Sequence, residues 1–223
     1  MTQIKKISTQ LAIFIEGSIS RPDRFFEKLN TDLGEIIDQM PQVMPVPQEI
    51  PFEMPIVVGS SVSGKYSLNI SKNRIDFIQN YSATEDNKKQ LLEFKSKCKL
   101  ALSLSGIEYK ISRIGMVGNF YVESQNPSAF ITKKFFKKED QNLEEASIRT
   151  NKISNEFGVK FNNVFSLSVA TIGSQNYNGP AVIIQADSNI LPNQPLVSKE
   201  TLIEIFEKKS SAYSDEYINE RVS

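Results

Sequence analysis

The sequence predicts an α+β fold with one large, curved antiparallel sheet and helices on one of its faces. Short segments with alternating apolar residues are joined by tight turns, which is typical of antiparallel strands. Longer segments between these groups carry apolar residues every three or four positions, which is typical of helices that bury one side. The chain has 223 residues, enough for a sizeable core, and we expect residues 1–223 to form a single domain.

The first half of the chain predicts the order strand, helix, three strands, helix. Alternation over residues 11–19 indicates a strand, and Pro22 begins a helix whose apolar positions continue to Met40. Residues 41–55 contain five prolines, which excludes a helix or a central strand and indicates an extended connector. The second helix ends at Gly106. The three strands before it are expected at residues 56–61, 66–71 and 75–80.

The second half predicts the same order of elements. It starts with a long strand at residues 109–122, and Asn126-Pro127 begins the next helix. The closing helix starts near Ser198, and residues 213–218 extend it. The three strands between these helices are expected at residues 143–157, where helical spacing is poor, and at 164–172 and 181–186.

The repeated order has two explanations. One is an internal duplication of a β-α-β-β-β-α unit, with halves at residues 7–106 and 107–218, which would leave one sheet face free for a partner. The other is that similar elements begin and end alike for physical reasons, without duplication. Three pairs of motifs favour duplication: Pro22-x-x-Phe25-Phe26 with Pro127-x-x-Phe130-Ile131, Ile78-Gln79 with Ile184-Gln185, and Leu91-Leu92-Glu93-Phe94 with Leu202-Ile203-Glu204-Ile205.

The composition excludes several classes of function. The chain has no histidine, which excludes Ser-His and Cys-His nucleophile pairs and imidazole metal sites. Its formal charge of zero provides no overall field that would attract nucleic acid or an anionic membrane. We predict no catalytic residues, no cofactor and no metal site. An enzyme that uses a spatial cluster of Lys, Tyr, Asp or Glu side chains stays open as an alternative.

Cysteine content and apolar runs predict a cytoplasmic location. The run Leu11–Ile15 is shorter than the core of a secretory signal, and no run approaches the ~18 residues that span a bilayer. Cys98 is the one cysteine, which excludes an intrachain disulfide. It lies on the apolar face of its predicted helix, so we expect a buried, inert thiol.

The segment Gly59-Ser-Ser-Val-Ser-Gly64-Lys65 satisfies the G-x4-G-K pattern of phosphate-binding loops. Such a loop needs a Ser or Thr after the lysine and then a helix, but Tyr66 occupies that position and the following residues alternate like a strand. We therefore interpret the segment as a hairpin between two strands.

The segment Lys133-Lys134-Phe135-Phe136-Lys137-Lys138 interleaves aromatic and basic residues, as a nucleic-acid or membrane patch would. Glu139 and Asp140 follow at once, and Glu144 and Glu145 soon after, so the local charge largely cancels. We expect a helix that buries both phenylalanines while its lysines reach solvent. The proline-rich connector is expected to pack on its own domain, with an exposed arm for a partner as the alternative.

Arg113 interrupts an apolar strand, on the face opposite Ile114 and Met116. Asn119 and Tyr121 share its face by alternation, so these three residues are our candidates for a partner or ligand face. An unpaired arginine in the middle of a sheet needs a carboxylate or a ligand anion. The alternative is an ordinary arginine that faces solvent.

At Arg113-Ile114-Gly115 the chain resembles an uncharacterised, sporadically distributed bacterial protein family with a mid-chain R-I-G strand motif. The order of elements is similar from about Pro55 to Tyr217. The family pattern continues with a basic-aromatic pair and an asparagine, whereas Met116-Val117-Gly118-Asn119 follows in this chain. The resemblance implies no known activity and no site residues.

These observations predict a non-catalytic protein-interaction or scaffold protein. Its partner would be another protein or a second copy of the chain, with the homodimer formed through the sheet or residues 213–218. The alternative is a small apolar-ligand-binding protein with a cavity between sheet and helices. The 14 phenylalanines and 5 methionines could line such a cavity.

Overall fold

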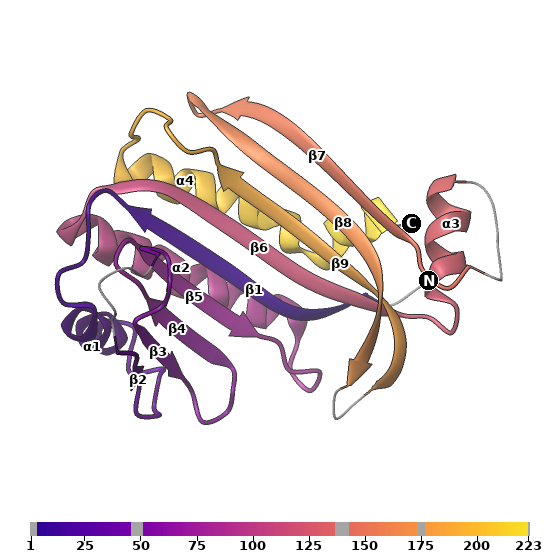
Figure 1. Ribbon diagram of the computed structural model, residues 1–223, viewed down its shortest axis with the longest axis horizontal. Coiled ribbons are helices and arrows are strands. Elements are labelled where there is room, and N and C mark those ends of the chain that lie inside the picture. Colours follow the sequence, from indigo (N-terminus) through magenta and orange to yellow (C-terminus); the bar gives the residue numbers. More distant parts are fainter. Residues whose placement is uncertain (1–3, 46–50, 137–142, 174–176, 223) are drawn as a thin grey trace.

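The computed structural model describes residues 4–45, 51–136, 143–173 and 177–222 (Figure 1). The strands are β1 (Ile4–Ile15), β2 (Gln42–Val43), β3 (Val57–Ser60), β4 (Tyr66–Ile70), β5 (Arg74–Asn80), β6 (Ile111–Glu123), β7 (Ser147–Glu156), β8 (Val159–Gly173) and β9 (Asn178–Ile190). The helices are α1 (Pro22–Asp32), α2 (Asn87–Glu108), α3 (Pro127–Phe136), α4 (Lys199–Ser210) and α5 (Asp215–Val222), with a 3-10 turn, η1, at Ser211–Tyr213.

The strands form one open antiparallel sheet in the order β2-β3-β4-β5-β1-β6-β9-β8-β7. Figure 1 looks onto the face away from the helices, with α2 and α4 behind the strands. The predicted α+β class, a large curved antiparallel sheet with helices on one face, is confirmed. Within the described ranges, no helix is long and apolar enough to cross a membrane.

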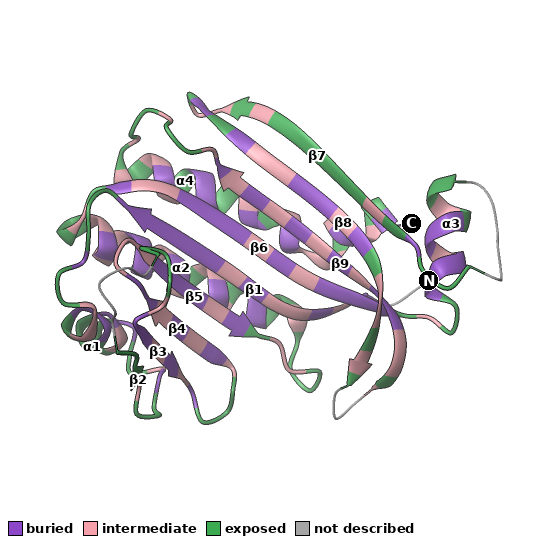
Figure 2. Cartoon of the chain, in the orientation of Figure 1, coloured by how far each residue is buried: buried purple, intermediate pink, exposed green. Residues whose placement is uncertain are grey.

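The pairing of β1 with β6 joins two wings of the sheet. Leu11 lies opposite Met116, and Ile13 lies opposite Ile114. All four side chains are fully buried, and burial of each stabilises the fold by about 1.5–3 kcal/mol. Helix α2 packs on β1 and helix α4 on β6. Figure 2 shows the result, with β1 and β6 largely buried and β7 exposed along most of its length.

The internal duplication is not confirmed. Each half contributes one wing, and each has the order β-α-β-β-β-α once the two-residue strand β2 is set aside. The matched motifs, however, differ in register. Ile78 pairs with Gln10 of β1, which lies twelve positions before Pro22. Ile184 pairs with Phe120 of β6, which lies only seven positions before Pro127. The duplication therefore stays a prediction.

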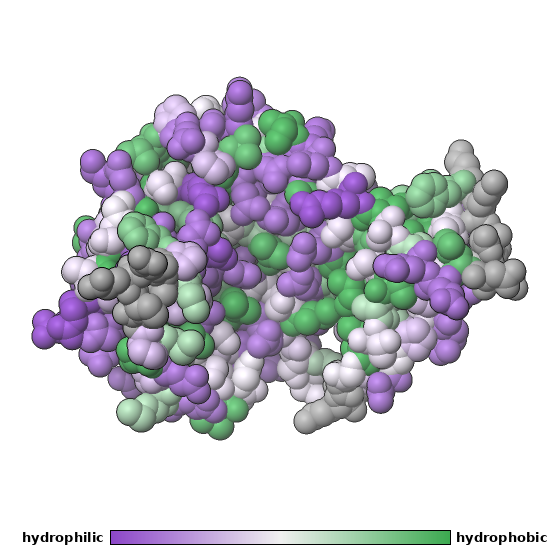
Figure 3. Space-filling view, in the orientation of Figure 1, coloured by the Kyte–Doolittle hydropathy of each residue, from purple (hydrophilic) through white to green (hydrophobic). Residues whose placement is uncertain are grey.

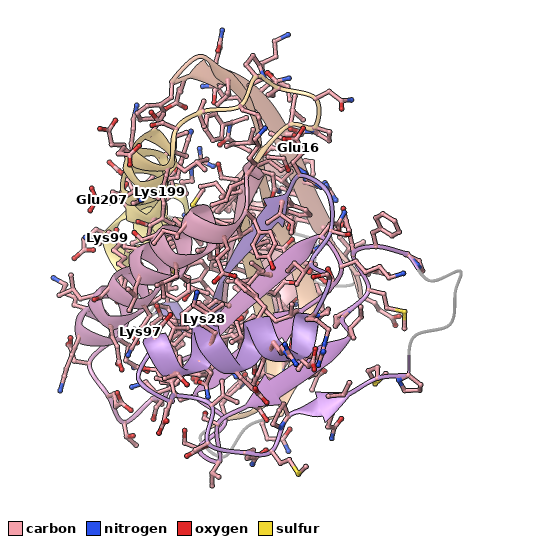
Figure 4. The ribbon with its side chains drawn as sticks, turned by 90° about the vertical axis from the view of Figure 1, so that its left-hand side faces the viewer. Glu16, Lys28, Lys97, Lys99, Lys199 and Glu207 are labelled. Atoms are coloured by element: carbon pink, nitrogen blue, oxygen red, sulfur yellow. The ribbon has the colours of Figure 1, made fainter. Side chains whose placement is uncertain are left out.

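Aromatic side chains fill the layer between sheet and helices. The ring of Phe94 on α2 stacks on that of Phe77 on β5, with centroids 5.9 Å apart, and lies 6.2 Å from Phe206 on α4. Cys98, one turn along α2, is fully buried as predicted, and burial raises the pKa of its thiol. On the outer side of the helices, Lys99 and Glu207 form an exposed ion pair between α2 and α4 (Figure 4).

The prediction that the first helix reaches Met40 is wrong. Helix α1 ends at Asp32, because Gly34 and Glu35 adopt positive φ angles of 87° and 53° and turn the chain away. The side-chain amide of Asn30 then bonds both the N–H and the carbonyl of Ile37 at 2.9 Å, which buries Ile37 outside the helix. The first strand also differs from its prediction, since it begins at Ile4 and ends at Ile15.

The basic-aromatic segment does not bury its phenylalanines as expected. Phe136 is 60% exposed and Phe135 is also exposed. Helix α3 uses its first turns, through Ala129 and Ile131, to contact the sheet, so its last turn extends beyond the sheet. Lys137, Lys138, Glu139 and Asp140 lie outside the described residues.

The hairpin interpretation of the G-x4-G-K segment is confirmed, since it connects β3 to β4. Gly64 has a φ of 70°, which a glycine adopts without strain. Gly59 has a different role, because it lies under α1. A Cβ atom at Gly59 would come within 2.4 Å of the Phe26 ring and 2.8 Å of Ile37.

The substitution Gly59→Ala should destabilise the protein, because the buried ring of Phe26 has no room to move away. We expect the free energy of unfolding to fall by about 1–3 kcal/mol, measured by chemical denaturation. The control is Gly173→Ala, where a Cβ atom meets nothing within 4 Å. Equal stability of the two variants would contradict this packing.

Candidate binding face

The sheet face away from the helices carries a mixture of polar and apolar side chains. Arg113, Asn119 and Tyr121, the three predicted candidates, all project from β6 on this open face, since they pair with residues of β1 at alternating positions. Figure 3 shows hydrophilic and hydrophobic residues interspersed over this face. The residues fall into separate clusters rather than one site.

Two arginines enclose the ring of Phe14 on the open face. The guanidinium carbon of Arg113 lies 3.5 Å from the ring centroid, and that of Arg74 lies 5.0 Å away. Phe14 is only 7% exposed although no helix covers it. A guanidinium over an aromatic ring is attracted by the ring electrons, so Phe14 holds both arginines in place.

Carboxylates complete this group. Glu53, from the proline-rich connector, lies 3.3 Å from Arg113 and 3.7 Å from Arg74. Asp76 accepts hydrogen bonds from Arg74 at 2.8 Å and from Gln10 at 2.7 Å. We call Phe14, Glu53, Arg74, Asp76 and Arg113 the arginine cluster. The carboxylate that the sequence required for Arg113 is thus supplied by Glu53.

The local sequence explains the position of Arg113. Ser112 is an extra residue in β6, where the register with β1 shifts, and its hydroxyl donates to the Phe14 carbonyl at 3.1 Å. The bulge turns Ile111 to the core side, while Arg113 keeps the alternation that places it on the open face. Gly115 leaves space for the Asn189 side-chain amide, whose oxygen would lie only 2.0 Å from a Cβ atom at this position. The R-I-G motif therefore has a structural purpose at each position.

A cavity of about 360 Å³ lies beside the arginine cluster. Asp187 and Asn189 of β9 line its other side, and the Asn189 amide donates to the Asp187 carboxylate. Burial raises the pKa of Asp187, while nearby Arg149 opposes the shift. Burial also lowers the pKa of Arg113, with the charge of Arg74 adding to the effect. Its guanidinium nevertheless stays protonated.

Asn119 and Tyr121 belong to other parts of the face. Asn119 donates to Ser8 at 3.0 Å and accepts from Gln185 at 3.1 Å, so its amide links three strands. Tyr121 stacks on Tyr177 with centroids 6.1 Å apart. Six residues of extended strand separate Arg113 from Asn119, about 20 Å.

A larger cavity, of about 690 Å³, opens next to Tyr121 at the end of β1. Lys6 reaches into its wall, and its ammonium group lies 2.9 Å from an Asp215 carboxylate oxygen. The Lys6 side chain is almost completely buried, and its ammonium also lies 5.6 Å from the ring centroid of Tyr81. The pair fixes α5 against the end of the sheet.

These arrangements suit binding better than proton transfer. In the arginine cluster each carboxylate is paired with an arginine, and the Asp187 carboxylate accepts from an amide. In the part of the chain that the structure describes, no three His, Cys, Asp or Glu side chains are grouped to hold a metal ion. What the cluster offers is a charged surface, in which the buried ring of Phe14 positions two arginines.

Sequence reasoning missed most of the arginine cluster. Arg74 and Asp76 alternate with buried residues of β5, so the same alternation that predicts the face of Arg113 also indicates these two residues. Glu53 could not be found that way, because its connector approaches the face only in the folded chain.

Comparison with models of known protein families and with curated proteins found no match for this chain. The resemblance to the bacterial family at Arg113-Ile114-Gly115 therefore stays a prediction.

Double-mutant cycles should show that Phe14 holds Arg113 more firmly than Glu53 does. The coupling of Phe14→Leu with Arg113→Gln should be about 0.5–2 kcal/mol, because the ring and the guanidinium are partly desolvated. The coupling of Glu53→Gln with Arg113→Gln should be at most about 1 kcal/mol, because the carboxylate is half exposed.

Chemical denaturation at low and high salt measures both couplings. Only the Glu53 coupling should decrease strongly in ~1 M NaCl, where charges are screened over about 3 Å. A Phe14 coupling that disappears in salt, or that is smaller than the Glu53 coupling, would contradict the assignment.

Proposed function

We propose that this chain is a non-catalytic interaction protein that binds another protein on the open face of its sheet. The observation that carries the proposal is the arginine cluster, in which two arginines and an aromatic ring are held rigidly on a face that no helix covers. Arginine and aromatic side chains dominate the binding energy of protein interfaces. Rigid side chains also lose little conformational entropy when a partner binds.

The connector beside the cluster supports a protein partner. Phe52 and Met54, on either side of Glu53, are 55% and 44% exposed, and Val43 of β2 is exposed as well. In Figure 4, β2 lies on the opposite side of the molecule from Lys99 and Glu207. Exposed apolar residues next to a charged anchor are typical of an interface. This supports the alternative of an exposed connector rather than one packed on its own domain.

The chemistry of the face favours a partner that presents a carboxylate next to an apolar side chain. Glu53 is such a group within the chain, with Phe52 and Met54 beside it, and it contacts both arginines at distances above 3.2 Å. A partner carboxylate would take the place of Glu53 and bury the apolar neighbours. A second copy of the chain could supply it, which would make the protein a homodimer.

The finer predictions belong to the same proposal. A cytoplasmic protein is favoured by the lone buried Cys98, and bacterial origin by the resemblance at the R-I-G motif. The alternative of an apolar ligand between sheet and helices has less support, because Phe77, Phe94 and Phe206 fill that layer.

Affinity capture from a lysate of the native host tests the proposal, with Arg113→Glu as the variant. The reversed charge should repel the partner carboxylate, so the amount of a specific partner bound should fall at least about tenfold, equivalent to 1.4 kcal/mol. The control is Arg24→Glu, which makes the same charge change on the exposed side of α1. Circular dichroism should show that both variants are folded.

Sedimentation velocity of the purified chain distinguishes the two partners. A dimer that Arg113→Glu dissociates and Arg24→Glu does not would assign the face to self-association. Capture that is equal for the wild type and Arg113→Glu, together with an unchanged sedimentation profile, would contradict the proposed face.

A further inference from the structure

A second polar cleft, of about 510 Å³, lies on the helix side of the sheet between α4–α5 and strands β7 and β8. Four cationic side chains line it, and among the described residues Glu156 is the one carboxylate that faces it, because Asp187 projects to the open face beside Asn189, so the formal charge of the cleft is +3. This differs from the chain as a whole, which has no net charge. The charged residues that face the cleft are Lys152, Glu156, Lys208, Lys209 and Arg221.

The cleft contains hydrophilic side chains at sheet positions whose neighbours on the same face are apolar. Asn163 of β8 and Ser188 of β9 lie opposite one another. On each strand, the residues two positions before and two positions after belong to the hydrophobic core. The Ser188 hydroxyl donates to the Asn163 amide at 2.8 Å, and that amide donates to the Ser154 hydroxyl at 3.0 Å. Polar groups at core-facing positions indicate a hydrated site rather than incomplete packing.

Two of the cations share one carboxylate. Glu156 lies 2.9 Å from Lys208 and 2.5 Å from Lys209. The hydrogen bond from Lys209, and then that from Lys208, lowers the pKa of Glu156 to about 2. Glu156 therefore stays charged at neutral pH and holds both lysines at the edge of the cleft.

The other two cations have no carboxylate partner among the described residues. The guanidinium of Arg221 lies between the rings of Phe165 and Tyr217, 5.0 and 5.2 Å from their centroids. Within the described ranges, neither Arg221 nor Lys152 takes part in an ion pair. Arg221 is thus positioned by aromatic contacts, and its hydrogen-bond donors stay available.

We propose that this cleft binds a small organic phosphate monoester, with Arg221 and Lys152 on the phosphate. A phosphate monoester carries close to two negative charges at neutral pH, which would be balanced by Arg221 and Lys152, the two cations without a carboxylate partner among the described residues. Arginine bonds phosphate oxygens in pairs, and Phe165 and Tyr217 provide an apolar wall for the organic part. The volume lies within the range of small-molecule sites.

Isothermal titration with phenyl phosphate, an aromatic phosphate monoester, tests the proposal. Arg221→Gln should weaken binding about tenfold, because it removes a charge-assisted pair. Glu156→Gln should strengthen binding severalfold, because it frees Lys208 and Lys209 from their carboxylate. Arg24→Gln, the same substitution on α1 outside the cleft, should leave the affinity unchanged.

Further probes make the result specific. Inorganic phosphate should bind more weakly than phenyl phosphate if the aromatic wall takes part, and Arg221→Lys should recover part of the lost affinity. Thermal melting of each variant checks that it is folded. Equal affinity of wild type and Arg221→Gln would overturn the proposal. So would no binding of phenyl phosphate at ~10 mM, a concentration above the ~1 mM dissociation constant of a weak site, which corresponds to −4.1 kcal/mol. Binding to vesicles with phosphatidic acid but not to phenyl phosphate would overturn it as well.

Discussion

The antiparallel pairing of β1 with β6 is the interaction on which the rest of the molecule depends. It joins β5, β4 and β3 on one side to β9, β8 and β7 on the other, so one sheet extends through the whole chain. Without it, each wing would expose an edge strand of twelve or thirteen residues. The buried row of Leu11, Ile13, Ile114 and Met116 keeps the register, since a slip by one residue would turn these side chains to the open face.

The same register determines what the open face can do. Phe14 lies opposite Arg113 in the pairing, and β5 brings Arg74 to the other side of β1. An apolar ring on an uncovered sheet face is shielded by two guanidinium groups instead of by a helix. The balanced charge of the chain therefore hides two distinct environments, a neutral arginine cluster on the open face and a positive cleft beneath β7 and β8.

Local patterns in the sequence predicted much of this fold. Alternation is a property of a single strand, so it identified β8 and β9 and the side of β6 from which Arg113 projects. It failed at the end of α1, where Ile36 and Ile37 continue a helical spacing but Gly34 turns the chain first. Gly34 is itself a helix-stop signal, so the end of α1 is encoded in the sequence by this cap residue and not by the apolar spacing.

The binding sites depend on pairing between distant segments, which single-strand patterns do not contain. Glu53 reaches Arg113 from a connector sixty residues earlier in the chain. Arg221 and Lys152 meet at the cleft from α5 and β7. Register and strand order brought these residues together, and neither could be derived from one sequence.

Native-state hydrogen exchange tests most directly whether the β1–β6 pairing makes the chain one cooperative domain. The slowest amides of β1, β6, β4 and β8 should exchange with a single free energy, equal to that of global unfolding, because both wings share one core. If residues 107–218 exchanged through a lower-energy opening while residues 7–106 stayed protected, the two wings would be separate units. That result would contradict the central role of the β1–β6 pairing.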